Sequence, residues 1–301
     1  MSDEKFISGW TFLVKKHLRN AVYSNVWIAL GAGMATFQTT LLLGQKSWLL
    51  SVFVALSTFF IYNFQRVLKL NMPDGHYIPG RNNWLIRNQK FIVVLTALSG
   101  IIMLGIGTQL LVRDWILMAI PAVVSMWYAA QLRIGSIQIE PLRHVPQLKL
   151  YLIGITWAVS LVALPFIHYY GWNVIGEFRF ILMFAECFAF VVAITIPFDI
   201  RDSKMDPAHF KTLPQKIGGT RAKIVGVGWL LSSSISAFGM LYIEAYTFWY
   251  ALGMVLVNAL AALLILKTTD EKSEMYYTGW IDGTIVLKAA IAILTLSVGN
   301  V

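Results

Sequence analysis

Charged residues are scarce in this chain: they make up 13% of its 301 residues, whereas hydrophobic residues make up 57%. Soluble domains carry roughly 25% charged residues, because their surfaces face water. The scarcity of charge therefore excludes a soluble domain. It predicts a polytopic membrane protein of the all-α class.

Cysteine is nearly absent as well. The single cysteine, Cys187, lies inside an apolar run, so a disulfide within the chain is excluded and a small buried side chain is expected. The five histidines are scattered without paired spacing, which disfavours a heme or electron-transfer site.

The N-terminus lacks the uninterrupted apolar stretch of a cleaved signal peptide ahead of its basic cluster at residues 15–19. Four apolar residues instead share one helical face. This pattern predicts that residues 1–20 form an amphipathic helix on the cytoplasmic surface of the membrane, before a transmembrane domain of residues 21–301. The apolar face consists of Phe6, Trp10, Leu13 and Val14.

Nine stretches are long and apolar enough to cross a bilayer core of roughly 30 Å at a rise of about 1.5 Å per residue. We therefore predict nine transmembrane helices, with long polar connections after the second and the sixth. The predicted segments are 22–43, 47–68, 91–111, 114–131, 148–166, 177–199, 222–242, 244–266 and 281–299.

Positive charge is divided unevenly between the two sides of this topology. Of the 24 Lys and Arg residues, only Lys46, Arg113 and Arg179 lie opposite the N-terminus, and Lys288 lies within the ninth segment. Cytoplasmic loops carry an excess of Lys and Arg. We therefore expect an integral membrane protein, in a bacterial inner membrane, with its N-terminus in the cytoplasm and its C-terminus outside. The net charge of +9 reflects this orientation, and no nucleic-acid binding is predicted.

Three carboxylates cluster in the connection after the sixth segment. Asp199, Asp202 and Asp206 stand at i, i+3 and i+7, so on a helix all three point from one face. Like charges on one stripe repel each other unless a cation lies between them. A divalent metal that holds a phosphorylated ligand, most simply Mg²⁺, explains the cluster.

The connection after the second segment begins with another polar stripe, because Asn63 and Arg66 lie one helical turn apart. Four crossings separate the two polar connections, so both are expected to emerge on the cytoplasmic face. Any chemistry is therefore predicted to face the cytoplasm.

The sixth connection contains the run Asp199-Ile-Arg-Asp-Ser-Lys-Met-Asp206, followed by Thr212-Leu-Pro-Gln-Lys-Ile-Gly218. With the nine crossings and the two polar connections, this run resembles the second aspartate-rich motif of the UbiA superfamily of intramembrane prenyltransferases. The stretch Arg143-His-Val-Pro-Gln-Leu-Lys149 is similar to a basic stretch that is common in the family. The resemblance covers nearly the whole chain.

The resemblance implies a helical bundle around a central cavity that opens to the cytoplasm and into the lipid. It implies Mg²⁺-dependent transfer of a prenyl group from a polyprenyl diphosphate to a lipophilic or aromatic acceptor, the work of a transferase of alkyl groups other than methyl. The three aspartates are then the catalytic metal ligands. No obligate protein partner is inferred. The cations expected to bind the diphosphate are Arg143, Lys149, Arg201 and Lys216.

The first aspartate-rich motif of the family is altered here: the chain has Asn63, Gln65, Arg66 and Lys69 in this run and no carboxylate before Asp74. Asn63 still offers an oxygen to a metal, although amide oxygens bind Mg²⁺ more weakly than carboxylates do. Arg66 is predicted to hold the diphosphate in place of a metal, because a guanidinium matches phosphate oxygens in bidentate fashion. We expect one tightly held metal ion.

Two charged residues fall inside predicted helices, where an ionised group is costly. Glu186 is expected to be protonated, to be paired inside the bundle or to line the acceptor cavity. Lys288 is expected either to reach the cytoplasmic mouth and touch the diphosphate or to pair with a carboxylate such as Asp282. Asp282 itself is expected to cap its helix.

Three functions remain open. The first is Mg²⁺-dependent prenyl transfer, favoured by the aspartate stripe with its flanking cations. The second is a non-catalytic protein of the same fold that binds isoprenoid or quinone-like lipids, favoured by the altered first motif. A secondary transporter ranks last, because the polar residues crowd one face instead of the midplane.

Overall fold

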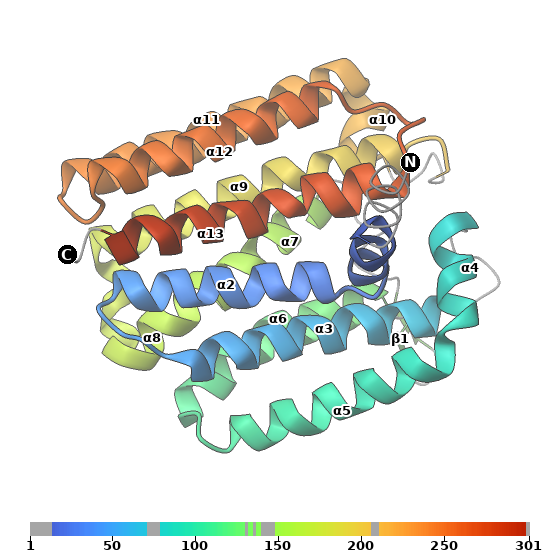
Figure 1. Ribbon diagram of the computed structural model, residues 1–301, viewed down its shortest axis with the longest axis horizontal. Helices are drawn as coiled ribbons and strands as arrows, with labels where there is room; N and C mark the ends of the chain where they lie inside the picture. The colour runs from blue at the N-terminus through green and yellow to red at the C-terminus, as the bar shows by residue number, and fades with distance from the viewer. Residues whose placement is uncertain are drawn as a thin grey trace, which may run out of the picture.

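The computed structural model describes residues 14–70, 79–129, 132–134, 137–139, 148–205 and 211–298. Long helices run side by side along one axis and form a bundle (Figure 1). The elements in chain order are α2 (Val26–Leu42), α3 (Trp48–Leu70), α4 (Pro79–Arg87), α5 (Gln89–Gly107), α6 (Val112–Ala129), β1 (Leu132–Ile134), β2 (Ile137–Ile139), α7 (Leu148–Ala158), η2 (Val159–Ala163), α8 (Leu164–Tyr170), η3 (Trp172–Gly176), α9 (Phe178–Asp202), α10 (Leu213–Ile217), α11 (Gly219–Tyr242), α12 (Phe248–Leu266), η5 (Met275–Ile281) and α13 (Gly283–Val298).

Among the described residues, helix is found in each of the nine predicted segments, which confirms the all-α class of a polytopic membrane protein. Seven spans are long and apolar enough to cross a membrane. The remaining two segments correspond to α2, which is apolar but has only 17 residues, and to α6. The number of nine crossings therefore stays a prediction. The seven spans are Trp48–Leu68, Gln89–Gly107, Leu148–Tyr170, Phe178–Asp202, Gly219–Tyr242, Phe248–Leu266 and Met275–Ser297.

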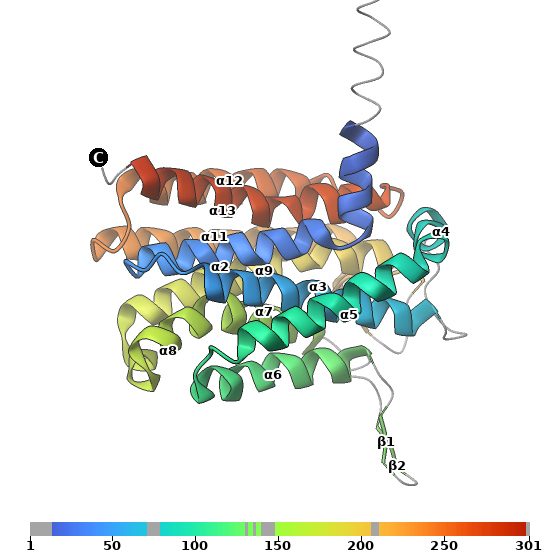
Figure 2. The ribbon, with the colours of Figure 1, turned by 60° about the horizontal axis from the view of Figure 1, so that its bottom comes forward.

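The connections contain structure that the sequence analysis did not predict. Strands β1 and β2 pair antiparallel and project from the bundle beyond α6 (Figure 2). The short helix α10 begins at Thr212, whose side chain and that of Gln215 cap each other's backbone N–H groups. Helix α4 begins at Pro79, a residue whose missing N–H costs nothing in the first turn.

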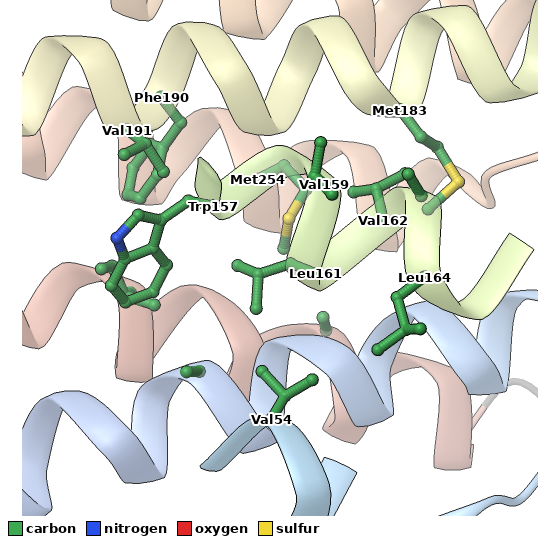
Figure 3. Close-up of a cluster of buried hydrophobic side chains, with 14 of the residues drawn as sticks. Val54, Trp157, Val159, Leu161, Val162, Leu164, Met183, Phe190, Val191 and Met254 are labelled. Carbon is green, nitrogen blue, oxygen red and sulfur yellow. The ribbon is translucent and has the colours of Figure 1, made fainter. Parts of the chain in front are cut away.

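The span from Leu148 to Tyr170 changes its winding in the middle of the bundle, where η2 is a π-helical turn. Pro165 follows that turn and has no N–H to donate to it. Side chains of this span form the centre of the core. Figure 3 shows Leu161 and Leu164 of this span in one cluster with Val54 of α3, and Val162 near Met183 of α9.

Small residues allow the helices to approach closely, as is usual inside membranes. A Cβ atom on Gly154 of α7 would lie 2.7 Å from Val192 and 2.9 Å from Phe188, both on α9. The glycine thus permits the close contact between α7 and α9. That contact places the first turn of α7 beside the last turn of α9.

The described parts of the two long polar connections lie at the same end of the bundle. Helices α4 and α10 lie at this end, and α8 lies at the other (Figure 1). Residues 14–23 are helical and stand across the bundle direction at the same end (Figure 2). Residues 1–13 of the predicted amphipathic helix lie outside the described residues. We call the end with α4 and α10 the polar end.

Candidate active site

A cavity of about 890 Å³ lies inside the bundle. Much of its wall is apolar, with side chains such as Phe53, Trp157 and Leu161. Its charged side chains come from element ends at the polar end. A cavity of this size, mostly apolar with a few polar groups, is typical of a site for a small organic ligand.

Four cations among the described residues line the cavity, and each comes from a different helix: Arg66 of α3, Arg81 of α4, Lys149 of α7 and Arg201 of α9. The structure therefore brings together three of the cations that the sequence analysis singled out. Arg81 was not among them. A group of cations around one cavity favours an anionic ligand.

Arg81 and Arg201 share one carboxylate. Arg81 Nη1 lies 2.8 Å from Glu274 Oε1, and Arg201 Nη1 lies 2.6 Å from Glu274 Oε2. Arg201 also holds its neighbour Asp202 through two hydrogen bonds, of 2.7 Å from Nε and 3.1 Å from Nη2. We call Arg81, Arg201, Asp202 and Glu274 the arginine network. It fixes the two guanidinium groups at the cavity wall.

Asn63 supports this network from behind. Its side chain is fully buried and does not line the cavity. Its Oδ1 accepts a hydrogen bond of 2.8 Å from Asn25 Nδ2, and Asn25 Oδ1 in turn accepts one of 2.6 Å from Arg81 Nη2. The amide oxygen of Asn63 is thus held by Asn25 and does not face the cavity, and its role as a metal ligand stays a prediction.

Arg66 differs from the other cations. It lines the cavity, yet within the described part of the chain it makes no hydrogen bond and no ion pair. A guanidinium without a partner inside a membrane protein is costly, unless an anion or water compensates its charge. Arg66 is therefore the cation that is most available to a bound anion.

Lys149 and Asp199 form an ion pair of 2.5 Å across the contact between α7 and α9. Asp199 is buried and does not line the cavity, whereas Asp202, one turn later, does. Asp199 and Asp202 of the predicted stripe therefore differ in their surroundings, because only Asp202 faces the cavity. Asp206 and Arg143 lie outside the described residues.

Two other predicted ligands lie away from the cavity lining, namely Lys216 of α10 and Lys288 of α13. Lys288 Nζ lies 3.1 Å from Glu186 Oε1, and Tyr246 donates a hydrogen bond of 2.7 Å to Glu186 Oε2. Pairing of Glu186 inside the bundle is confirmed. The suggestion of Asp282 as the partner of Lys288 was wrong, because residues six apart on a helix point to different faces.

The comparisons with known proteins were made by sequence and by structure. No family model matches the chain, and no curated protein matches it. A solved structure of a UbiA homologue from Archaeoglobus fulgidus, bound to GPP and Mg²⁺, matches it with a TM-score of 0.59 and 12% identity over 93% of this chain and 98% of that chain. The structure of a UbiA homologue from the same organism bound to DMAPP and Mg²⁺ gives 0.55 and 14% over the same shares.

A third solved structure, of a digeranylgeranylglyceryl phosphate synthase, matches with a TM-score of 0.56 and 14% identity over 93% of this chain and 95% of that chain. These matches cover nearly the whole bundle. The chain has the UbiA fold. The resemblance inferred from the sequence is confirmed at the level of the fold.

The UbiA fold raises the question of a metal. Among the described residues no group of three or more His, Cys, Asp or Glu side chains is placed to hold an ion. Mg²⁺ is commonly bound by one or two carboxylates together with phosphate oxygens of a ligand. Asp202 offers one cavity-facing carboxylate, whose oxygens keep lone pairs beyond the bonds from Arg201. The residues present thus fit one Mg²⁺ ion that arrives with a phosphorylated ligand.

Four residues at this site escaped the sequence analysis as candidates: Asn25, Arg81, Glu274 and Asp282 all line the cavity. Arg81 and Glu274 lie in connections that were expected to be irregular, Asn25 lies near the start of the predicted segment 22–43, and Asp282 was expected to cap a helix. The available signal was weak. It consisted of Pro79 as a helix start two residues before Arg81, and of an acidic residue, Glu274, two residues before the aromatic pair Tyr276-Tyr277.

Proposed function

We propose that this chain transfers a prenyl group from an isoprenoid diphosphate to a lipophilic or aromatic acceptor in the membrane, and that the transfer depends on Mg²⁺. The observation that carries the proposal is the cavity, which has apolar walls and four cations at its polar end. An isoprenoid diphosphate is divided in the same way, into an apolar chain and an anionic head. GPP and DMAPP, with Mg²⁺, are bound in the UbiA homologue structures.

The cations have a direct role in this reaction. When the allylic C–O bond breaks, its electron pair stays with the diphosphate, which gains negative charge. Fixed cations such as Arg66 and Arg201 then stabilise the transition state more than the bound substrate. Mg²⁺ at Asp202 would neutralise further charge on the same phosphate oxygens. The apolar wall keeps water away from the allylic carbon.

One observation favours a second candidate, a protein that binds isoprenoid or quinone-like lipids without catalysis. Both oxygens of Asp202 accept hydrogen bonds from Arg201, and both oxygens of Glu274 are held by arginines. Carboxylates engaged in this way bind a metal less readily. We rank this candidate second, because a neutral quinone-like lipid offers no negative charge to Arg66, which has no partner among the described residues.

The proposal includes an orientation. The polar end and the N-terminus face the cytoplasm, the C-terminus faces the outside, and the membrane is a bacterial inner membrane. The support is the excess of Lys and Arg on the N-terminal side of the predicted topology. An isoprenoid diphosphate would then enter the cavity from the cytoplasm.

The first test measures binding of a non-hydrolysable analogue of geranyl diphosphate to purified protein, with Mg²⁺ and with EDTA. Three proteins are compared: the native chain, Asp202→Asn, and the matched control Asp270→Asn, whose carboxylate does not line the cavity. We expect Mg²⁺ to strengthen binding to the native chain and to the control. In Mg²⁺, Asp202→Asn should bind about 10-fold more weakly or worse, the loss expected for one charged interaction.

In EDTA, the expected effect of Asp202→Asn on the affinity for the analogue has the opposite sign. Without metal, Asp202→Asn should bind the analogue at least as tightly as the native chain, because Arg201 is released from its carboxylate. If Mg²⁺ makes no difference to the native chain while the analogue still binds, the non-catalytic candidate is correct. In that case no product should form from labelled geranyl diphosphate.

A further inference from the structure

Asp282 is a carboxyl group of the cavity that has no partner. Its side chain lines the cavity, and within the described residues it makes neither a hydrogen bond nor an ion pair. The other acidic groups near the cavity that the structure describes are engaged: Asp199 with Lys149, Asp202 with Arg201, and Glu274 with two arginines. Asp282 is thus the exception.

The direction of Asp282 follows from its helical neighbours. Thr278, Asp282 and Ile285 all line the cavity, and their spacing of four and three residues places them on one helical face. The expected role of Asp282 as a helix cap does not account for this, because its side chain faces the cavity.

The depth of Asp282 can be placed against α2, which packs beside η5 and α13. Trp27 donates a hydrogen bond of 3.1 Å to the carbonyl of Gly279, and its Nε1 lies 3.3 Å from the position of a Cβ on Gly283. Along the bundle axis, Asp282 therefore lies at about the same height as Trp27. Asn25, which holds Arg81, lies closer to the polar end, by less than one helical turn of about 5.4 Å.

This position lies just below the cations, on the apolar side. A diphosphate held by the arginine network and Arg66 would have its allylic carbon next to the phosphates, toward the apolar part of the cavity. Asp282 is on the wall of that part. A carboxyl group without a partner in this setting is stabilised by a ligand that donates a hydrogen bond.

We propose that Asp282 binds the hydroxyl group of the acceptor and takes its proton during transfer, so that the acceptor is a hydroxyl-bearing lipophilic compound. This inference rests on the proposed prenyl transfer and names its second substrate by chemistry. The allylic C–O bond breaks with its electron pair going to the diphosphate. A lone pair of the hydroxyl oxygen forms the new bond to that carbon, and the hydroxyl proton passes to the Asp282 carboxylate.

Binding is tested first, without turnover. The probes are 4-octylphenol and 1-dodecanol, each paired with its methyl ether, which keeps the size but has no proton to donate. Trp115 and Trp157 line the cavity, so tryptophan fluorescence can report binding. The native chain should bind at least one hydroxyl probe about 10-fold more tightly than its ether.

Two substitutions separate hydrogen bonding from proton transfer. Asp282→Leu has no acceptor atom, so the preference for the hydroxyl probe over the ether should disappear. Asp282→Asn keeps an oxygen that accepts a hydrogen bond but takes no proton. It should retain part of the preference, while transfer of the geranyl group to the hydroxyl probe falls by about 100-fold or more. Asp270→Leu, a substitution at a partly exposed residue that does not line the cavity, controls for general damage.

The affinity for the non-hydrolysable donor analogue is measured in the same variants and should not change. If it falls in Asp282→Asn and loses its dependence on Mg²⁺, Asp282 belongs to the diphosphate site, which overturns this inference but not the proposed function. Equal binding of every hydroxyl probe and its ether to the native chain also overturns it. If the donor analogue fails to bind at all, the proposed function fails, and the hydroxyl preference still decides whether Asp282 binds an acceptor.

Discussion

Two of the groups of charged side chains within the helical bundle are built differently. The arginine network at the polar end lines a cavity of about 890 Å³ and lies beside Arg66, a cation without a partner in the part of the chain that the structure describes. The second group, Glu186 with Lys288 and Tyr246, lines a pocket of about 50 Å³. We call the ion pair of Glu186 and Lys288 the interior pair.

The interior pair is satisfied within the chain. Glu186 receives an ion pair on one oxygen and a hydrogen bond on the other, and Lys288 Nζ also lies 4.2 Å above the ring of Phe190. Its pocket has room for water but not for an organic ligand. Leu161, Val191 and Ile285 line both spaces and form the wall between them. The comparison shows that a buried charge alone does not indicate a ligand site. A ligand site is indicated by a charge without a partner next to a cavity that has room for the ligand.

The largest effect is expected from breaking the interior pair. Lys288→Met keeps the length of the side chain but leaves the Glu186 carboxylate without its cation. Removing one partner of a buried pair costs about 3–5 kcal/mol. The unfolding midpoint in detergent should therefore fall steeply. The double variant with Glu186→Gln should recover much of the loss, because no charge is left buried.

A matched control for this experiment is Lys223→Met. Lys223 donates its hydrogen bond to the carbonyl of Leu266 in an exposed position, so its loss should change stability by about 0.5 kcal/mol or less. Comparable destabilisation by both lysine substitutions, or no recovery in the double variant, would contradict the assignment of the interior pair as structural. The donor-analogue affinity of Lys288→Met should equal that of the native chain.

The next effect in size comes from Arg66→Met. Since this guanidinium has no partner among the described residues, its removal should leave stability unchanged or raise it. Affinity for the diphosphate analogue should instead fall by about 1.5–3 kcal/mol, the contribution of a hydrogen bond to a charged group. Arg66→Met is therefore expected to lower affinity without lowering stability, whereas Lys288→Met is expected to lower stability without lowering affinity.

Arg66→Lys provides the finer control. A lysine keeps the charge but not the bidentate fork, so part of the affinity should return. Full loss of affinity in Arg66→Lys would show that geometry matters more than charge. An unchanged affinity in Arg66→Met would remove Arg66 from the ligand site.

The fold was predictable because its signals are local. Hydropathy over about 20 residues defines a membrane span regardless of what lies beside it. Helix accordingly occupies every predicted segment within the described residues. The short helix α10 also has a local signal, because Thr212 and Gln215 have the spacing of a capping box, although the sequence analysis did not predict a helix there.

The candidate site was predictable only in part, because its contacts join distant residues. Arg66, Lys149 and Arg201 were found from their helix ends, since a charge at the end of an apolar segment stands out. Arg81 meets Glu274 across 193 positions of the chain, and no pattern near either residue specifies the partner. Helical spacing placed Asp199 and Asp202 on one face but did not reveal that Lys149 covers the first of them.

The smallest effect is expected from an exposed ion pair at the polar end, which tests whether charge pairs there matter in general. Lys204 pairs with Asp270, and the Lys204 side chain is 79% exposed. The hydrogen bond from Lys204 lowers the pKa of Asp270 below its ordinary value of 3.8, so the contribution of Asp270 to stability is present at neutral pH and is lost only as the pH falls below that value. Water and salt screen such a pair. The unfolding midpoint of Asp270→Asn at pH 7 should match that of the native chain at low and at high salt, in contrast to the steep fall for Lys288→Met. A large drop at low salt alone would mean that surface charge, and not burial, sets the strength of ion pairs at this end of the bundle.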